Sequence, residues 1–242
     1  AETEATLSAP ERLNVTTSVE GKAVVYENGV YKVAPAVAAI TANEVTRYYA
    51  TLQAAVNAAQ ANETVTLLSD AAGAGVVIDK NVTIDFGGNI YTVNQAVGSA
   101  GTETLGFQIL KDNDVTLKNG TLTSTTPVVA GKEVKMLIQN YADLTLTDMN
   151  LVDATEHIQY VLSNNSGISY IKGATNITTD AVAFDVYDYT AGGYAHPTVN
   201  VNTTGNITGA IEVSESISNN LNISGGLFTT AIAEAWCADG FF

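Results

Sequence analysis

A short pattern of apolar and polar positions recurs along the second two-thirds of the chain. An apolar, a small polar and an apolar residue follow one another, and then come a turn and a further apolar residue. Such alternation is typical of a half-buried β-strand whose two apolar side chains share one face. The strong copies are Val82-Thr83-Ile84, Val115-Thr116-Leu117, Leu144-Thr145-Leu146, Val199-Asn200-Val201 and Leu221-Asn222-Ile223, and a weaker copy ends at Ile171.

The spacing of these copies is typical of stacked supersecondary units. Their last apolar residues fall at 84, 117, 146, 171, 201 and 223, so successive copies lie 22 to 33 residues apart. Three short strands per period, without a helix, exclude helical repeats. They predict an all-β fold, a right-handed parallel β-helix, whose coils pair in parallel around one core. The third strand of each period is expected at 107–110, 136–138, 160–162, 182–186 and 211–213.

The predicted interior consists of the apolar residues of the strong copies. In an alternating strand, Val82 and Ile84 point inward while Thr83 points to solvent. We therefore expect stacked rungs of Val82, Ile84, Val115, Leu117, Leu144, Leu146, Val199, Val201, Leu221 and Ile223.

Both ends of such a coil need a cover, because open ends expose unpaired strand edges. The sequence predicts an amphipathic helix at 51–61 with Thr51 as its N-cap, and this helix would cover the first coil. A short helical turn at 231–238 would cover the last coil with Ile232 and Trp236.

The first part of the chain has a different pattern. Residues 13–33 alternate like strands about Asn28-Gly29, a dipeptide that favours a two-residue hairpin turn. The chain is therefore divided into a small β appendage at 1–48 and the β-helix at 49–242.

Charge and composition exclude several classes of partner. The formal net charge is −15, and the only arginines are Arg12 and Arg47, so the clustered bases that bind nucleic acid are missing. No apolar run approaches the roughly 18 residues of a spanning helix, so we expect no membrane insertion. One cysteine, Cys237, allows no internal disulfide. An acidic, Thr- and Asn-rich chain that starts with Ala-Glu-Thr-Glu-Ala suits a secreted or cell-wall-associated bacterial protein after signal-peptide removal.

Stretches at both ends of the predicted β-helix resemble a known family. Tyr49-Ala-Thr-Leu-Gln-Ala-Ala-Val, Glu63-Thr-Val-Thr-Leu-Leu-Ser-Asp and Asp79-Lys-Asn-Val-Thr-Ile-Asp-Phe-Gly-Gly-Asn together resemble the first coil of pectin-lyase-like β-helix modules in surface proteins of anaerobic Gram-positive bacteria. Ile223-Ser-Gly-Gly-Leu-Phe with Ala238-Asp-Gly-Phe is similar to the last coil of these modules. The resemblance covers about 49–242 and implies a secreted or cell-wall-associated module, part of a longer adhesin-like chain. It implies no catalytic residue.

Enzymes with this fold need residues that are not apparent here. Lyases take a proton with Arg or Lys beside Ca²⁺ held by aspartates, and hydrolases use paired carboxylates. Both arginines precede the first coil, no Asp-Asp pair occurs, and His157 and His196 lie far apart in the sequence. We expect no catalytic residues, no metal and no cofactor. The alternative is a polysaccharide lyase or glycoside hydrolase whose catalytic set the sequence does not reveal.

One pair of carboxylates leaves two interpretations open. Asp114 and Asp143 each precede an apolar-Thr-apolar strand. Neighbouring coils lie about 4.8 Å apart, so these carboxylates either share a Ca²⁺ ion or splay apart into solvent. The second interpretation is preferred.

The candidate ligand-binding residues lie in the longest insertion, residues 187–197. Tyr187, Tyr189 and Tyr194 each offer a flat apolar face and a hydroxyl, which suits a sugar ring or an interface with another protein. The alternative is that they fold back to cover the side of the coil. Because this insertion follows a third strand, whereas 94–104 and 125–132 follow second strands, it should project from a different corner.

These features together predict a non-catalytic stalk or adhesin-like module. Its expected partners are a glycan, or a protein of a host or cell surface.

Overall fold

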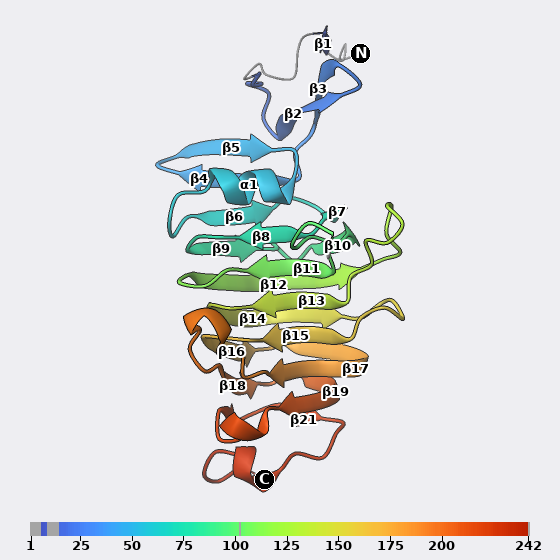
Figure 1. The fold of residues 1–242 in the computed structure, drawn as a ribbon. Helices are drawn as coiled ribbons and strands as arrows, with labels where there is room; N and C mark the ends of the chain where they lie inside the picture. The colour runs from blue at the N-terminus through green and yellow to red at the C-terminus, as the bar shows by residue number, and fades with distance from the viewer. Residues whose placement is uncertain (1–5, 9–14, 102, 242) are drawn as a thin grey trace.

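The fold is dominated by β-strands. The computed structural model describes residues 6–8, 15–101 and 103–241, so Arg12 and the first five residues lie outside the described part. Eighteen strands form one large sheet, and three form a separate small sheet (Figure 1). The prediction of an all-β chain is confirmed. No helix in the described ranges is long and apolar enough to cross a membrane.

The strands of the large sheet follow one another with short turns and a few longer loops. Near its first end lie β4 (Ala38–Ala42), β5 (Val45–Tyr49), β6 (Thr64–Leu67), β7 (Ala71–Ala74), β8 (Val76–Ile78), β9 (Val82–Asp85) and β10 (Ile90–Gln95). The middle holds β11 (Leu105–Ile109), β12 (Asp114–Ser124), β13 (Met136–Asn140), β14 (Asp143–Val152), β15 (Tyr160–Asn164) and β16 (Ile168–Gly173). The last part holds β17 (Asn176–Val186), β18 (Thr198–Thr203), β19 (Asn206–Val213), β20 (Leu221–Ile223) and β21 (Leu227–Phe228).

From β6 onward these strands pair in parallel, and the predicted apolar residues stack in register. One column of successive partners is Ile84, Leu117, Leu146, Ile171, Val201 and Ile223. A second column is Val82, Val115, Leu144, Ser169, Val199 and Leu221. All these side chains are buried, so the ten predicted interior residues are confirmed.

Ser169 explains why the copy that ends at Ile171 is weak. It takes an inward position that is apolar in the other coils, and its Oγ donates to Asn164 Oδ1 at 2.7 Å. Asn164 in turn accepts from Asn140 Nδ2, also at 2.7 Å. These buried polar groups satisfy one another, which is what burial of an amide requires. They lie at the corner where β13 and β15 turn into the next strand.

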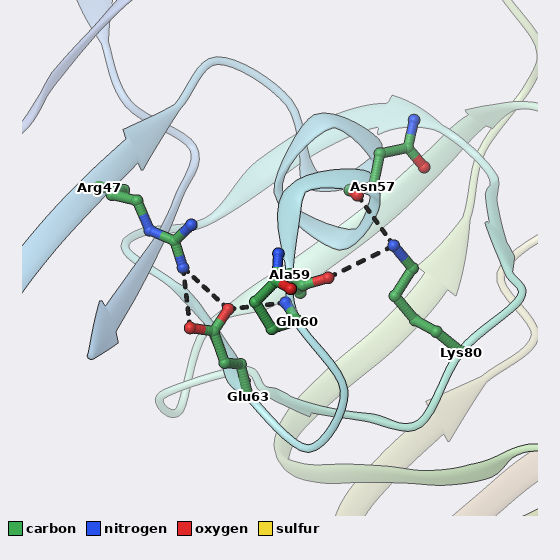
Figure 2. Close-up of polar contacts among 6 residues, drawn as sticks. All are labelled: Arg47, Asn57, Ala59, Gln60, Glu63 and Lys80. Atoms are coloured by element: carbon green, nitrogen blue, oxygen red, sulfur yellow. Dashed lines mark hydrogen bonds and ion pairs between the residues drawn. The ribbon is translucent and has the colours of Figure 1, made fainter. Parts of the chain in front are cut away.

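A helix packs against β4, β5, β6 and β8 near the first end of the large sheet, and it is shorter than predicted. The helix α1 spans Leu52–Ala58, and the Thr51 side chain accepts from the backbone N–H of Ala54 as its N-cap. The helix ends early because Ala59 is extended and Glu63 ties down the chain beyond it, with Glu63 Oε2 accepting from the Gln60 N–H at 2.8 Å (Figure 2). That hydrogen bond, followed by those from Arg47, outweighs partial desolvation and holds the pKa of Glu63 below its usual value.

Lys80 completes the end of α1. Its Nζ donates to the carbonyl oxygens of Asn57 at 2.8 Å and Ala59 at 3.4 Å, which are among the orphan acceptors of a helix C-terminus (Figure 2). Arg47 on β5 donates from its Nη2 to both carboxylate oxygens of Glu63, at 2.8 and 2.9 Å. These contacts tie the helix and β5 to the turns that precede β6 and β9.

The small sheet contains the predicted hairpin. β2 (Lys22–Glu27) and β3 (Val30–Pro35) pair antiparallel about Asn28 and Gly29, both of which have positive φ, and β1 (Thr6–Ser8) pairs with β3. Residues 38–49 do not join this small sheet. β4 pairs antiparallel with both β5 and β6, so strand pairing with the large sheet begins before residue 48. The division of the chain into two units stays a prediction.

The segment after β21 carries a short turn of helix inside the predicted range 231–238. It is the 3₁₀ helix η3 (Glu234–Trp236), and Ile232 and Trp236 pack against the core. The backbone N–H of Ala238 donates to Ile223 O at 2.8 Å, so this segment pairs with the edge of β20.

Candidate functional site: a groove beside the loop 187–197

The loop 187–197 connects β17 to β18 and lies at one corner of the stack. Figure 1 places it, in orange with the 3₁₀ helix η1 (Ala191–Gly193), on the opposite side from the loop that follows β12. The loops after β10 and β12 contact each other, since the Ala96 N–H donates to Lys132 O and Lys132 pairs with Glu103. The prediction that 187–197 projects from a different corner is confirmed.

The loop folds back across the corners of earlier coils. Its Tyr189 and Tyr194 pack against Tyr141, which follows β13, with ring centroids 5.7 and 4.9 Å from the Tyr141 ring and 5.3 Å from each other. These three residues are half-buried. Burial raises the pKa of the Tyr141 hydroxyl. Tyr187 does not join this tyrosine cluster and is 52% exposed.

A groove of about 440 Å³ lies between this loop and the stacked turns. We call it the corner groove. Tyr141 and Tyr194 form one of its sides, and the turns before β9, β12, β14 and β16 supply the remainder. Lys111 directs its ammonium at the Tyr194 ring, 5.5 Å from the centroid. The polar groups that line the groove include Asn81, Asn113, Asp112, Asp114, Asp143 and Ser166.

Hydrogen bonds between coils fix the floor of the corner groove. The Asp114 backbone N–H donates to Asn81 Oδ1 at 2.9 Å, and the Ile168 N–H donates to Asp143 Oδ1 at 2.8 Å. Asn113 Nδ2 is used locally, donating to Leu110 O and Lys111 O. The remaining carboxylate oxygens of Asp114 and Asp143 belong to exposed side chains, which can accept hydrogen bonds from a ligand.

The loop is anchored at both of its ends. Asp188 Oδ1 lies 2.7 Å from His196 Nδ1 across the base of the loop, and Ser216 Oγ donates to Asp188 Oδ2. These two contacts, that from Ser216 first, hold the pKa of Asp188 below its usual value. Ser166 Oγ donates to Ala195 O at 2.9 Å, so the loop is tied to the corner below it. The segment that carries Tyr189 and Tyr194 is therefore held by hydrogen bonds at both of its ends.

The two aspartates singled out from the sequence are partners in register. Asp114 on β12 pairs with Asp143 on β14, as expected from the spacing. One oxygen of Asp143 already accepts from the Ile168 N–H. Among the described residues, no group of three or more His, Cys, Asp or Glu side chains is placed to hold a metal ion. His196 pairs with Asp188 rather than with His157.

A second polar site lies at the ends of β17 and β19, where the loop 187–197 begins. Asp185 on β17 pairs in register with Glu212 on β19, and a hollow of about 430 Å³ there is also lined by Tyr160 and Tyr187. Asp185 is only 7% exposed, and burial raises its pKa to about 7. This carboxylate pair is the feature that the sequence search for paired acids missed, because its members are separated by a whole coil.

Tyr141 was missed for a related reason. It comes from a turn two coils before the loop, and nothing in the alternating pattern shows that a long insertion folds back along the stack. The strand register could have indicated it, since Asn140, Asn164 and Val186 are successive partners and the residues after them share one corner.

Comparison of the chain with protein-family models, with curated proteins and with solved structures gives no match. The family resemblance expected from the sequence therefore stays a prediction.

Proposed function

We propose that the protein is a right-handed parallel β-helix, a non-catalytic secreted or cell-surface module of stalk or adhesin-like type that binds carbohydrate in the corner groove. The β-helix is supported by two buried columns of side chains that run through six successive coils. Right-handedness follows from the strong preference of parallel strand connections for that hand. The acidic, Thr- and Asn-rich composition supports exposure outside the cell.

The observation that carries the binding function is the composition of the corner groove. Tyrosine rings suit the apolar face of a sugar, and carboxylate and amide oxygens accept hydrogen bonds from its hydroxyl groups. Four stacked turns, about 4.8 Å apart, give the groove a length of roughly 14 Å along the stack. A binding surface of this kind recognises a short stretch of an extended chain.

The charge of the corner groove indicates which class of glycan it binds. Asp112, Asp114 and Asp143 line the groove, whereas its one lysine, Lys111, already faces the Tyr194 ring. A uronic acid would meet uncompensated carboxylates. We therefore expect neutral sugars or amino sugars as ligands, and no binding of uronate polymers.

Replacing Tyr194 by Ser tests the groove. A glycan array of neutral, amino and uronic sugars supplies a ligand, and calorimetry measures its affinity. We expect Tyr194→Ser to weaken binding by about tenfold or more, the equivalent of one lost stacking contact of roughly 1.4 kcal/mol. The matched control is Tyr170→Ser, because Tyr170 is exposed on β16 away from the groove. Equal losses in the two variants, or no glycan bound by the parent, would contradict the proposal.

The interpretation from the sequence, in which Tyr187, Tyr189 and Tyr194 all bind the ligand, has its own test. A Tyr187→Ser, Tyr189→Ser, Tyr194→Ser variant that keeps its melting temperature but loses binding supports a binding loop. A large fall in melting temperature would show that these tyrosines serve packing, and the assignment of Tyr187, Tyr189 and Tyr194 would be withdrawn.

The alternative, a carbohydrate-active enzyme, is favoured by one observation, the register pair of Asp185 and Glu212. Against it, Asp185 is buried and both of its oxygens are held by β15, so a substrate has little access to them. Formation of unsaturated uronate product or new reducing ends, above a heat-inactivated control and abolished by Glu212→Gln, would support the enzyme instead.

A further inference from the structure

Asp185 is a buried carboxylate that does not line the corner groove. Its Oδ1 accepts from the Asn164 backbone N–H at 2.8 Å, and its Oδ2 lies 3.1 Å from Ser163 Oγ. Glu212 is its neighbour on the next coil. The sequence has no Lys or Arg after Lys172, so this third of the chain supplies no cation to balance the two acids.

Ser163 donates to Asp185 but has a second acceptor within reach of the same hydroxyl. Its Oγ lies 3.1 Å from Asp185 Oδ2 and 3.1 Å from Asn165 Oδ1. A hydroxyl carries one hydrogen, so it can donate to only one of these two acceptors. The hydrogen bond from Ser163 Oγ to Asp185 Oδ2 therefore competes with the contact between Ser163 Oγ and Asn165 Oδ1, so Ser163 compensates the buried carboxylate only in part.

The other ionisable groups around Asp185 also favour its protonated form. Glu212 on β19 is a like charge, and its Oε2 accepts from Tyr160 Oη of β15 at 3.3 Å. Tyr187 lies at the exit of β17 and lines the same hollow. Burial first, with the repulsion of Glu212 added, raises the pKa of Asp185 to about 7 despite the hydrogen bonds from Asn164 and Ser163.

Asp185 and Glu212 lie next to the hydrogen-bonded residues at the base of the loop 187–197. The Tyr187 N–H donates to Asn164 O, the Ser214 N–H donates to Val186 O, and the Asp188 N–H donates to Ser214 Oγ, each at 3.0 Å. The residues at positions 186–188 and 213–214 therefore transmit the pairing of β17 with β19 to the loop. Repulsion between Asp185 and Glu212 acts on this pairing.

We propose that Asp185 and Glu212 form a pH-sensitive contact between β17 and β19, which we call the clasp. The clasp is closed when Asp185 is protonated, and it then orders the base of the loop 187–197. Ligand binding in the corner groove is therefore stronger in mild acid. The link to the groove rests on the proposed function, whereas the clasp itself does not.

The direction of the pH effect follows from linkage. The folded state holds a proton on Asp185 up to about pH 7, whereas an unfolded chain releases it near the ordinary value of 3.8. The stabilisation is therefore complete below about pH 4, declines as the pH rises to 7, and is absent above it. Asp188 titrates below its usual range and so does not contribute in this window.

The clasp is tested by thermal unfolding at several pH values between 4.5 and 8. We expect the melting temperature of the parent to fall by about 5 °C or more across this range. Because the net charge of −15 also favours the folded state in acid, the informative quantity is the difference between variants. Asp185→Asn, which mimics the protonated side chain, should lose most of this dependence, and Glu212→Gln should lose part of it.

Two controls make the result decisive. Asp180→Asn removes an exposed carboxylate from the same strand and should keep the dependence of the parent, as should His196→Asn, which removes the imidazole that contacts Asp188 in the loop. If Asp185→Asn keeps the slope of the parent, or if site-resolved NMR shows Asp185 ionised at pH 5.5, the clasp is wrong. A glycan that binds equally at pH 5 and 7.5 overturns only the link to the groove, and a failure to bind any glycan overturns only the proposed function.

Discussion

Leu146→Asp is expected to unfold the protein or to destabilise it by more than about 4 kcal/mol. Leu146 has no exposed surface and lies in the middle of a column, between Leu117 of the preceding coil and Ile171 of the next. An aspartate at this position is surrounded by apolar side chains and has no partner for its charge. Since folded proteins are stable by only about 5–15 kcal/mol, a loss of this size is visible in any thermal or urea melt.

The matched control is the neighbouring outward position. Thr145 pairs with Thr116 and Tyr170 on the opposite face of the same strand. Thr145→Asp adds the same charge to the same strand at a half-buried position on the outer face, so we expect a change below about 1 kcal/mol. If the two variants melt at similar temperatures, the inward and outward faces of β14 are wrongly assigned.

Deletion of residues 1–61 is expected to make the protein aggregate. It removes α1, whose Leu52, Ala55 and Val56 are buried over the first coil, and also β4, which covers the edge of β6. The shortened chain would expose the core and an unpaired parallel edge, and such edges recruit other chains. Size-exclusion chromatography with light scattering measures the outcome.

A shorter deletion separates the cover from the small sheet. Removal of residues 1–35 takes away β1, β2 and β3 but leaves β4, β5 and α1 in place. We expect this chain to stay free of aggregates and to keep the oligomeric state of the parent. A soluble, monomeric protein after deletion of 1–61 would show that α1 and β4 are not a necessary cover.

The parts of the fold that depend on local alternation could be predicted from the sequence. Inward residues such as Val115 and Leu117 alternate with a polar residue in five copies, and a period of two leaves only one face for the core. The N-cap Thr51 and the turn at Asn28-Gly29 were likewise predictable, because a capping hydroxyl and a positive φ each depend on a few adjacent residues.

The candidate site was harder to predict because it depends on contacts between coils. Tyr141 and Tyr194 are more than fifty residues apart in the chain, and their contact depends on the direction in which a long loop folds. Asp185 and Glu212 are recognised as neighbours only when β17 and β19 are paired in the correct register. Irregularities in this pairing shift the register. Local pattern therefore located the loop, but neither its tyrosine partner nor the acid pair beside it.

The most direct test of the proposed function is a crystal structure of the protein with a neutral or amino-sugar oligosaccharide selected on a glycan array. We predict electron density in the corner groove, with one sugar ring against Tyr194 or Tyr141 and hydroxyl groups within hydrogen-bond distance of Asp114 or Asp143. Density for the ligand elsewhere on the protein, with the corner groove holding only solvent, would contradict the account.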